Sequence, residues 1–157
     1  DFTKWDWLNQ SDYFILLNEN QGVCRAGIRC KDLHLPDPPV YYTEDDENWT
    51  LCAPTTTEFL LAALCYESVF TFPYSLEEFY YITEEEYSFI ESHLPKLPFQ
   101  LEYWVSDMKI TLYSTQPDNM VAIMDCGEDD ISMLYGAVSE SSYKELCALL
   151  ENIGEPM

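Results

Sequence analysis

The stretch at residues 16–27, LLNENQGVCRAG, decides how the first part of the chain folds. It joins two apolar runs, at residues 13–17 and 23–28, through four mainly polar residues: Glu19, Asn20, Gln21 and Gly22. A glycine can take the positive φ that a tight reversal needs, and an asparagine can hydrogen-bond to its own backbone. The stretch therefore predicts a β-hairpin, with strands over residues 13–18 and 23–30.

Side chains alternate between two faces along the second of these strands. Arg25 and Arg29 fall on one face, and the small or apolar residues Cys24, Ala26 and Ile28 fall on the other. We expect the apolar face to enter the core and the two arginines to pair with nearby carboxylates. A proline-rich loop over residues 31–39 should follow, and then two short strands at residues 40–43 and 49–52.

Capping signals mark three helices. Thr55 with Glu58, and Thr83 with Glu86, have the spacing of a capping box, which predicts helices over residues 55–68 and 83–94. The last helix should cover residues 141–153 and end at a glycine. In the first helix the apolar stripe predicts a buried face made of Phe59, Leu60, Ala63 and Leu64, widened by Leu61 and Cys65.

The hydrophobic period changes to two from residue 99 onward. Apolar residues alternate or cluster in four segments between turn signals at residues 106–107, 116–119 and 126–130, which predicts an antiparallel four-stranded meander. The segment at residues 75–82 fits either a short helix or a strand. Together these patterns predict an α+β fold, in which a largely antiparallel or mixed sheet packs against three or more helices, with all 157 residues in one domain.

The charge balance limits the possible partners. The chain has 29 acidic and 7 basic residues and a formal net charge of −22. Such a surface repels nucleic acid and anionic membranes, and it attracts cationic proteins or metal ions. An acidity that only keeps the protein soluble is the alternative. No apolar run approaches the roughly 20 residues of a membrane span, so we expect a cytoplasmic protein.

Three acidic segments are candidate partner-binding sites. Four adjacent carboxylates cannot be buried without counter-charges, so the run at residues 44–47 must be exposed or bind cations. A solvated loop is the preferred interpretation, and a cation site or a docking surface for a basic partner are the alternatives. Our hypothesis is that this run and two others supply part of a binding face. The ten residues are Glu44, Asp45, Asp46, Glu47, Glu84, Glu85, Glu86, Glu128, Asp129 and Asp130.

Motifs of catalysis and cofactor binding are missing from the sequence. Neither of the two histidines lies in a hydrolase or zinc-protease motif, and no phosphate-binding glycine loop occurs. The six cysteines form no CxxC pair, so we expect reduced thiols and no metal site at Cys24, Cys30 and His34. We therefore expect no enzyme activity and no cofactor. A hydrolase with a carboxylate pair is left as an alternative, since such pairs meet in space rather than along the chain.

Several short motifs resemble the SUKH superfamily, the cell-wall-assembly-regulator-like proteins. They are ENQGVC at residues 19–24 with GI at 27–28, DPPVY at 37–41, the acidic run with Trp49, and TEFLL at 57–61. The resemblance implies an α+β domain in which the ENQG turn is structural. Related sequences commonly have tryptophan where this chain has Ala26. They also have an N-terminal helical region that is absent or only hinted at here, which indicates a divergent or truncated member.

The resemblance also implies a function in protein binding. Bacterial members are similar to immunity proteins that neutralise toxins, often nucleases, and an acidic inhibitor suits a nuclease that holds polyphosphate with basic residues. The expected partner is therefore a basic toxin. The alternative is a regulatory or scaffold domain that recruits signalling or cell-envelope proteins, as eukaryotic members are thought to do.

Overall fold

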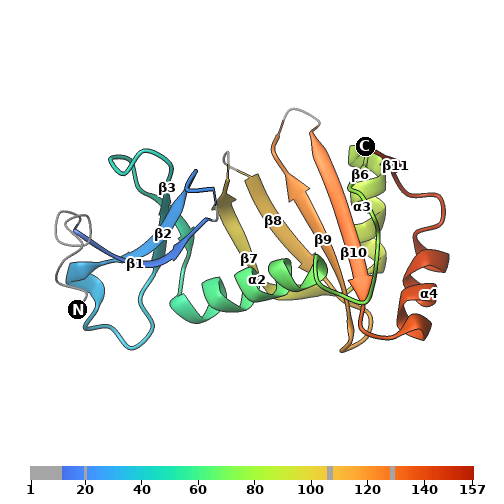
Figure 1. The fold of residues 1–157 in the computed structure, drawn as a ribbon, viewed down its shortest axis with the longest axis horizontal. Helices are drawn as coiled ribbons and strands as arrows, with labels where there is room; N and C mark the ends of the chain where they lie inside the picture. Colours follow the sequence, from blue (N-terminus) through green and yellow to red (C-terminus); the bar gives the residue numbers. More distant parts are fainter. Residues whose placement is uncertain (1–11, 20, 106–107, 128–129) are drawn as a thin grey trace.

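Two antiparallel sheets and three α-helices make up the described part of the chain, which in this computed structural model is residues 12–19, 21–105, 108–127 and 130–157. The predicted α+β class is confirmed. The expectations for the N-terminal region and for Asn20 concern residues outside this part. Figure 1 shows the smaller sheet at one end of the molecule and helices α3 and α4 at the other.

The smaller sheet has four strands in the order β1-β2-β3-β4. Their bounds are β1 Tyr13–Asn18, β2 Arg25–Arg29, β3 Val40–Thr43 and β4 Thr50–Ala53. The predicted hairpin forms, with Tyr13 opposite Arg29 and Phe14 opposite Ile28. Gly22 has a φ of 75°, and the Glu19 carboxylate accepts the backbone N–H of Gln21 at 2.6 Å. The ENQG turn is thus held by its own glutamate as well as by its glycine.

The larger sheet has seven strands. They are β5 Tyr74–Ser75, β6 Tyr80–Tyr81, β7 Lys96–Trp104, β8 Met108–Tyr113, β9 Asn119–Asp125, β10 Ile131–Ala137 and β11 Glu155–Pro156. Strands β7 to β10 form the predicted meander, each antiparallel to the next. The open choice between helix and strand for residues 75–82 is resolved as two short strands, β5 and β6, which both pair with β10 and are joined by a bend at residues 76–79.

Helices cover both faces of the larger sheet. Their bounds are α2 Thr56–Val69, α3 Glu84–His93 and α4 Glu140–Leu149, and a 3₁₀ turn occupies Cys30–Asp32. Alternate residues of β9 enter different cores: Ala122 and Met124 pack in a first core with α2, whereas Val121 and Ile123 pack in a second core with α3 and α4. The sheet therefore lies between α2 on one side and α3 and α4 on the other.

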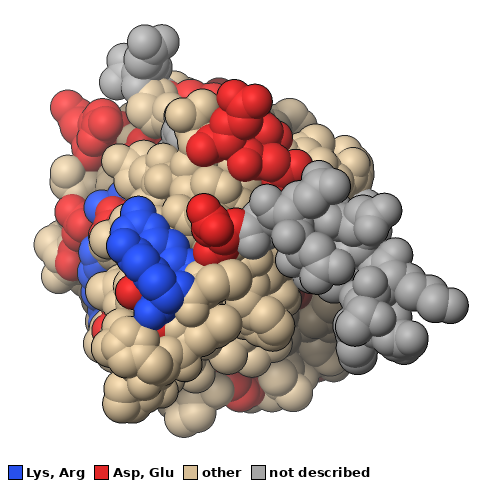
Figure 2. Space-filling view, turned by 90° about the vertical axis from the view of Figure 1, so that its left-hand side faces the viewer, with Lys and Arg blue, Asp and Glu red and all other residues tan. Residues whose placement is uncertain are grey.

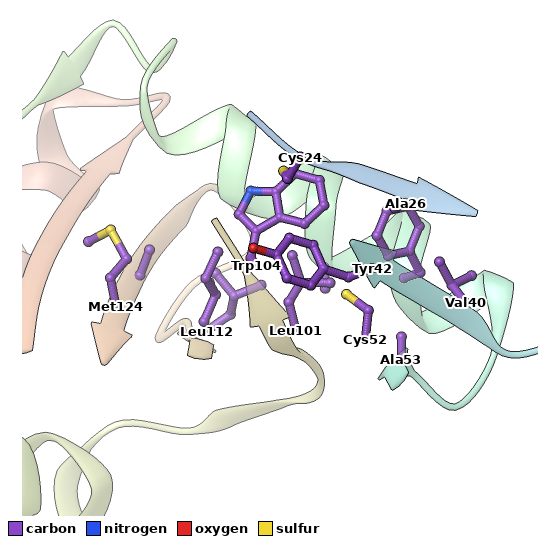
Figure 3. Packing of buried hydrophobic residues seen from close by; sticks show 14 of the residues in the cluster. Cys24, Ala26, Val40, Tyr42, Cys52, Ala53, Leu101, Trp104, Leu112 and Met124 are labelled. Atoms are coloured by element: carbon purple, nitrogen blue, oxygen red, sulfur yellow. The ribbon is translucent and has the colours of Figure 1, made fainter. Parts of the chain in front are cut away.

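Aromatic residues of the first core link the two sheets. The Trp104 ring of β7 lies 6.2 Å from the Tyr42 ring of β3 and 6.1 Å from the Phe59 ring of α2, measured between centroids. Figure 3 shows the Trp104 and Tyr42 side chains close together, with Cys24 and Cys52 beside them. Both sheets and α2 thus share one core, which explains why the predicted apolar face of β2 is buried.

The predicted buried face of α2 is partly wrong. Phe59 and Ala63 are buried as expected, but Ala62 takes a core position that the sequence pattern did not assign. The side chains of Leu60, Leu61 and Leu64 are 45%, 43% and 67% exposed. The helix carries apolar residues on all sides, so the hydrophobic periodicity of its sequence could not show which side is buried. Packing through two alanines brings the helix closer to the sheet than leucines would allow.

Substitution of Phe59 by alanine should cost about 3–5 kcal/mol of unfolding free energy, because it empties the contact between α2 and Trp104. Leu60→Ala is the matched control on the same helix and should cost less than about 1 kcal/mol. Urea unfolding at neutral pH measures both. Similar losses for the two variants would show that α2 is turned differently from the orientation described.

Candidate protein-binding surfaces

The first acidic run lies at the tip of the β3–β4 hairpin and is organised by Asp45. Its Oδ1 atom accepts the backbone N–H groups of Glu47 at 2.9 Å and Asn48 at 2.7 Å. Its Oδ2 atom accepts the Asn48 side-chain amide at 2.7 Å. These hydrogen bonds, those from Asn48 foremost, hold the pKa of Asp45 far below its ordinary value. Asp45 is therefore part of the loop structure.

The other carboxylates of this run differ in their surroundings. Asp46 forms an ion pair with Arg25, and Glu44 accepts the hydroxyl of Tyr42. Glu47 is exposed, and its carboxylate accepts no hydrogen bond from the described residues. The run is thus a structured, solvated loop. Glu47 is the member best placed to meet a partner.

Replacing Asp45 with alanine should loosen the hairpin tip without unfolding the sheet. The backbone amides of Glu47 and Asn48 lose their acceptor, so their hydrogen exchange should become faster. Glu47→Ala removes one charge as well but leaves those hydrogen bonds in place. Equal protection of the Asn48 amide in the two variants would contradict the role given to Asp45.

The second acidic run opens α3. The predicted capping box is present: Thr83 accepts the backbone N–H of Glu86, and Glu86 accepts the backbone N–H of Thr83 at 2.8 Å. Glu86 also accepts the backbone N–H of Gly154 at 2.9 Å, which ties the start of α3 to the turn before β11. Gly154 has a φ of 79° and packs against Ile82, so a larger residue fits poorly there. Glu84 and Glu85 are exposed.

The Glu86 carboxylate should stabilise the fold only while it is charged. Partial burial raises its pKa, but the hydrogen bonds from Gly154 and Thr83 outweigh burial, so the net pKa lies below the ordinary value of 4.5. Since the folded pKa is lowered, this stability is present above the unfolded pKa and is lost as the pH falls through the folded pKa.

Glu86→Gln should therefore lower the unfolding free energy by about 1 kcal/mol at pH 7, and the difference from the natural protein should shrink below about pH 4. Glu85→Gln also removes one negative charge, but the only interaction lost is that with the helix dipole. It should therefore lower the unfolding free energy by less than Glu86→Gln does. Urea unfolding between pH 3 and pH 7 measures both. A loss for Glu86→Gln that does not change with pH would contradict the assignment.

The third run lies in the β9–β10 loop. Asp130 is exposed, and its backbone N–H donates to the carbonyl of Gly127 at 2.9 Å. Glu128 and Asp129 lie outside the described residues. Figure 1 places the β3–β4 tip at one end of the molecule and α3 at the other, with the larger sheet between them. The structure therefore does not bring the first two acidic runs together into one face.

A cluster of aromatic and basic residues covers part of the outer face of the smaller sheet. Tyr13 stacks on Trp49 with ring centroids 3.8 Å apart, and the Arg29 guanidinium lies 3.9 Å above the Tyr41 ring. Arg29 also donates to the Tyr13 hydroxyl at 3.2 Å. Figure 2 shows basic side chains on this end of the molecule, amid largely uncharged surface with acidic groups around it.

The predicted pairing with a carboxylate is confirmed for Arg25, whereas Arg29 meets tyrosines within the described residues. Arg25 binds Asp46, whereas no ion pair of Arg29 occurs in the part of the chain that is described. The strand alternation correctly put both arginines on one face. It could not show that tyrosines of β1 and β3 would meet Arg29, because that depends on how the strands pair.

The exposed side of α2 is a further surface that the sequence did not predict. Leu60, Leu61 and Leu64 follow one another along it, and Glu67 continues the same side one turn later. At the end of the helix a groove of about 440 Å³ lies between Phe70 and the segment that connects β5 to β6. Exposed leucines in a row are typical of surfaces that bind other molecules.

The thiols and the possible metal ligands of the described residues bear on catalysis, because many catalytic sites need a reactive thiol or a bound metal ion. The described residues contain no group of three or more side chains suited to hold a metal ion. The cysteines are unpaired, with Cys24 buried and Cys30 exposed, and burial raises the pKa of Cys24 to about 11 and of Cys52 to about 12. Such thiols are protonated and unreactive at neutral pH. Within this part of the chain, no helix is long and apolar enough to cross a membrane.

No family model matches the chain, and comparisons with curated proteins and with solved structures also find no match.

Proposed function

We propose that this chain is a SUKH-like immunity protein that neutralises a basic toxin, such as a nuclease, by binding it inside the cell. One observation carries the proposal. The chain has 29 acidic and 7 basic residues, and the described residues form three ion pairs. Most carboxylates therefore lack a local counter-charge, and their combined field attracts a cationic protein.

The chemistry of nucleases supports this choice of partner. A nuclease holds a polyphosphate chain with lysines and arginines, and an inhibitor that presents carboxylates can cover those groups with complementary charge. Glu47 and Asp130 are exposed in loops, and Glu84 and Glu85 are exposed at a helix start, where they can reach such a partner without rearrangement of the core. Binding by a preformed surface needs no catalytic group.

Association with the proposed basic toxin, sought first among the products of the adjacent reading frames, should depend strongly on salt. The screening length falls about threefold between 50 and 500 mM salt, so the dissociation constant should rise by about tenfold or more. Isothermal titration calorimetry of the two purified proteins measures it. An unchanged dissociation constant over this range would refute the electrostatic basis of the proposal.

Three charge reversals, Glu47→Lys, Glu85→Lys and Asp130→Lys, locate the contact, because each changes the net charge by the same amount. The reversal that lies in the interface should weaken binding far more than the other two. Equal, small effects of all three would mean that only the overall field attracts the toxin and that none of these acidic runs touches it.

A further inference from the structure

The groove at the end of α2 combines an apolar lining with negative charge. Two phenylalanine rings form part of it, Phe70 and Phe79, in an edge-to-face arrangement with centroids 5.9 Å apart. Leu76 and Met157 add aliphatic surface. Its volume of about 440 Å³ lies within the range of sites that take small ligands or single side chains.

Glu77 and Glu78 supply the charge. Both are exposed, and they are the only charged side chains that line the groove in the described part of the chain. Neither takes part in an ion pair within the described residues, and Lys144 on the neighbouring helix α4 is paired with Glu140 at 2.6 Å. The two carboxylates are therefore available to a cation from outside.

The same two glutamates also border a second depression. It has a volume of about 510 Å³, and its lining includes Tyr74, Tyr80 and Tyr143. The acid pair thus lies between a phenylalanine-lined groove and a tyrosine-lined one. Aromatic rings beside a pair of carboxylates suit an arginine, because its guanidinium can stack on an aromatic face while it binds a carboxylate through two N–H groups.

We propose that the groove lined by Phe70, Phe79, Glu77 and Glu78 binds an arginine side chain presented by a cationic protein partner. The arginine methylenes lie along Phe79 and Met157, and the guanidinium reaches the two glutamates. This inference rests on the proposed function, since it gives the basic partner a specific point of attachment. Lysine fits less well because its ammonium group is more strongly hydrated and cannot form the paired contact.

The experiment uses the full chain with ¹³C-methyl-labelled methionine and the peptide acetyl-Gly-Arg-Gly-amide. Met157 lines the groove, whereas Met124 is buried in the first core, so the two methyl signals report the site and an internal reference. Titration should move the Met157 signal in a saturable way and leave the Met124 signal in place. The citrulline peptide, a neutral analogue of similar shape, should bind at least about tenfold more weakly.

Glu77→Gln with Glu78→Gln should weaken the arginine peptide by about tenfold or more. Glu145→Gln with Glu151→Gln is the matched control, because it removes two exposed charges that line neither depression and should change the dissociation constant less than about twofold. Thermal unfolding checks that both variants keep the fold. No shift of Met157, equal weakening in the two variants, or equal binding of the citrulline peptide would overturn the proposal.

Two further results separate this inference from the proposed function. Equal affinity for the lysine peptide acetyl-Gly-Lys-Gly-amide would overturn the preference for arginine. If the arginine peptide binds as described but no basic toxin binds the chain, the inference about the groove is supported and the immunity function is refuted. If the toxin binds with strong salt dependence and Glu77→Gln with Glu78→Gln changes nothing, the function stands and the groove is rejected as its contact.

Discussion

The packing of Trp104 against Tyr42 and Phe59 is the contact on which the rest of the structure depends. These three residues come from β7, β3 and α2, so one buried cluster joins both sheets and the helix. Beyond Tyr42, the four-stranded sheet contributes mostly small or aliphatic residues to this core, such as Cys24, Ala26 and Val40, so the aromatic contact is its largest link to the rest of the molecule.

A chain with so few cations must stabilise its carboxylates in another way. The structure does this with hydrogen-bond donors at turns and helix starts. Asp45 accepts amides of its own loop, Glu86 accepts those of Thr83 and Gly154, and Asp118 accepts the hydroxyls of Ser139 and Ser142 at the start of α4. Each arrangement lowers the pKa of its carboxyl. These acids are therefore structural, and the acids left for binding are fewer than the net charge suggests.

Local features were predictable from the sequence, and features set by long-range contacts were not. The ENQG hairpin, the box at Thr83 and the meander follow from residues that are neighbours in the chain, so pattern rules reach them. Three features depend on contacts between distant segments. They are the division of the strands between two sheets, the pairing of β11 with β6, and the orientation of α2 about its axis, which buries Ala62. For the same reason sequence patterns indicated runs of acids as candidate sites but not Glu77 and Glu78. These two residues became candidates only because the fold places aromatic rings beside them.

Charge and apolar surface contribute to protein binding in different ways, and the proposed binding uses both. A field from many exposed carboxylates speeds encounter, but at physiological salt it is screened beyond about 8 Å, so by itself it gives short-lived complexes. Long residence requires contacts from which water is excluded. An ion pair beside Phe70 and Phe79 would be screened less by water than an ion pair at the exposed tip of the β3–β4 hairpin, because the rings lower the local polarity. An acidic surface with an apolar groove at one edge can therefore combine rapid capture with slow release.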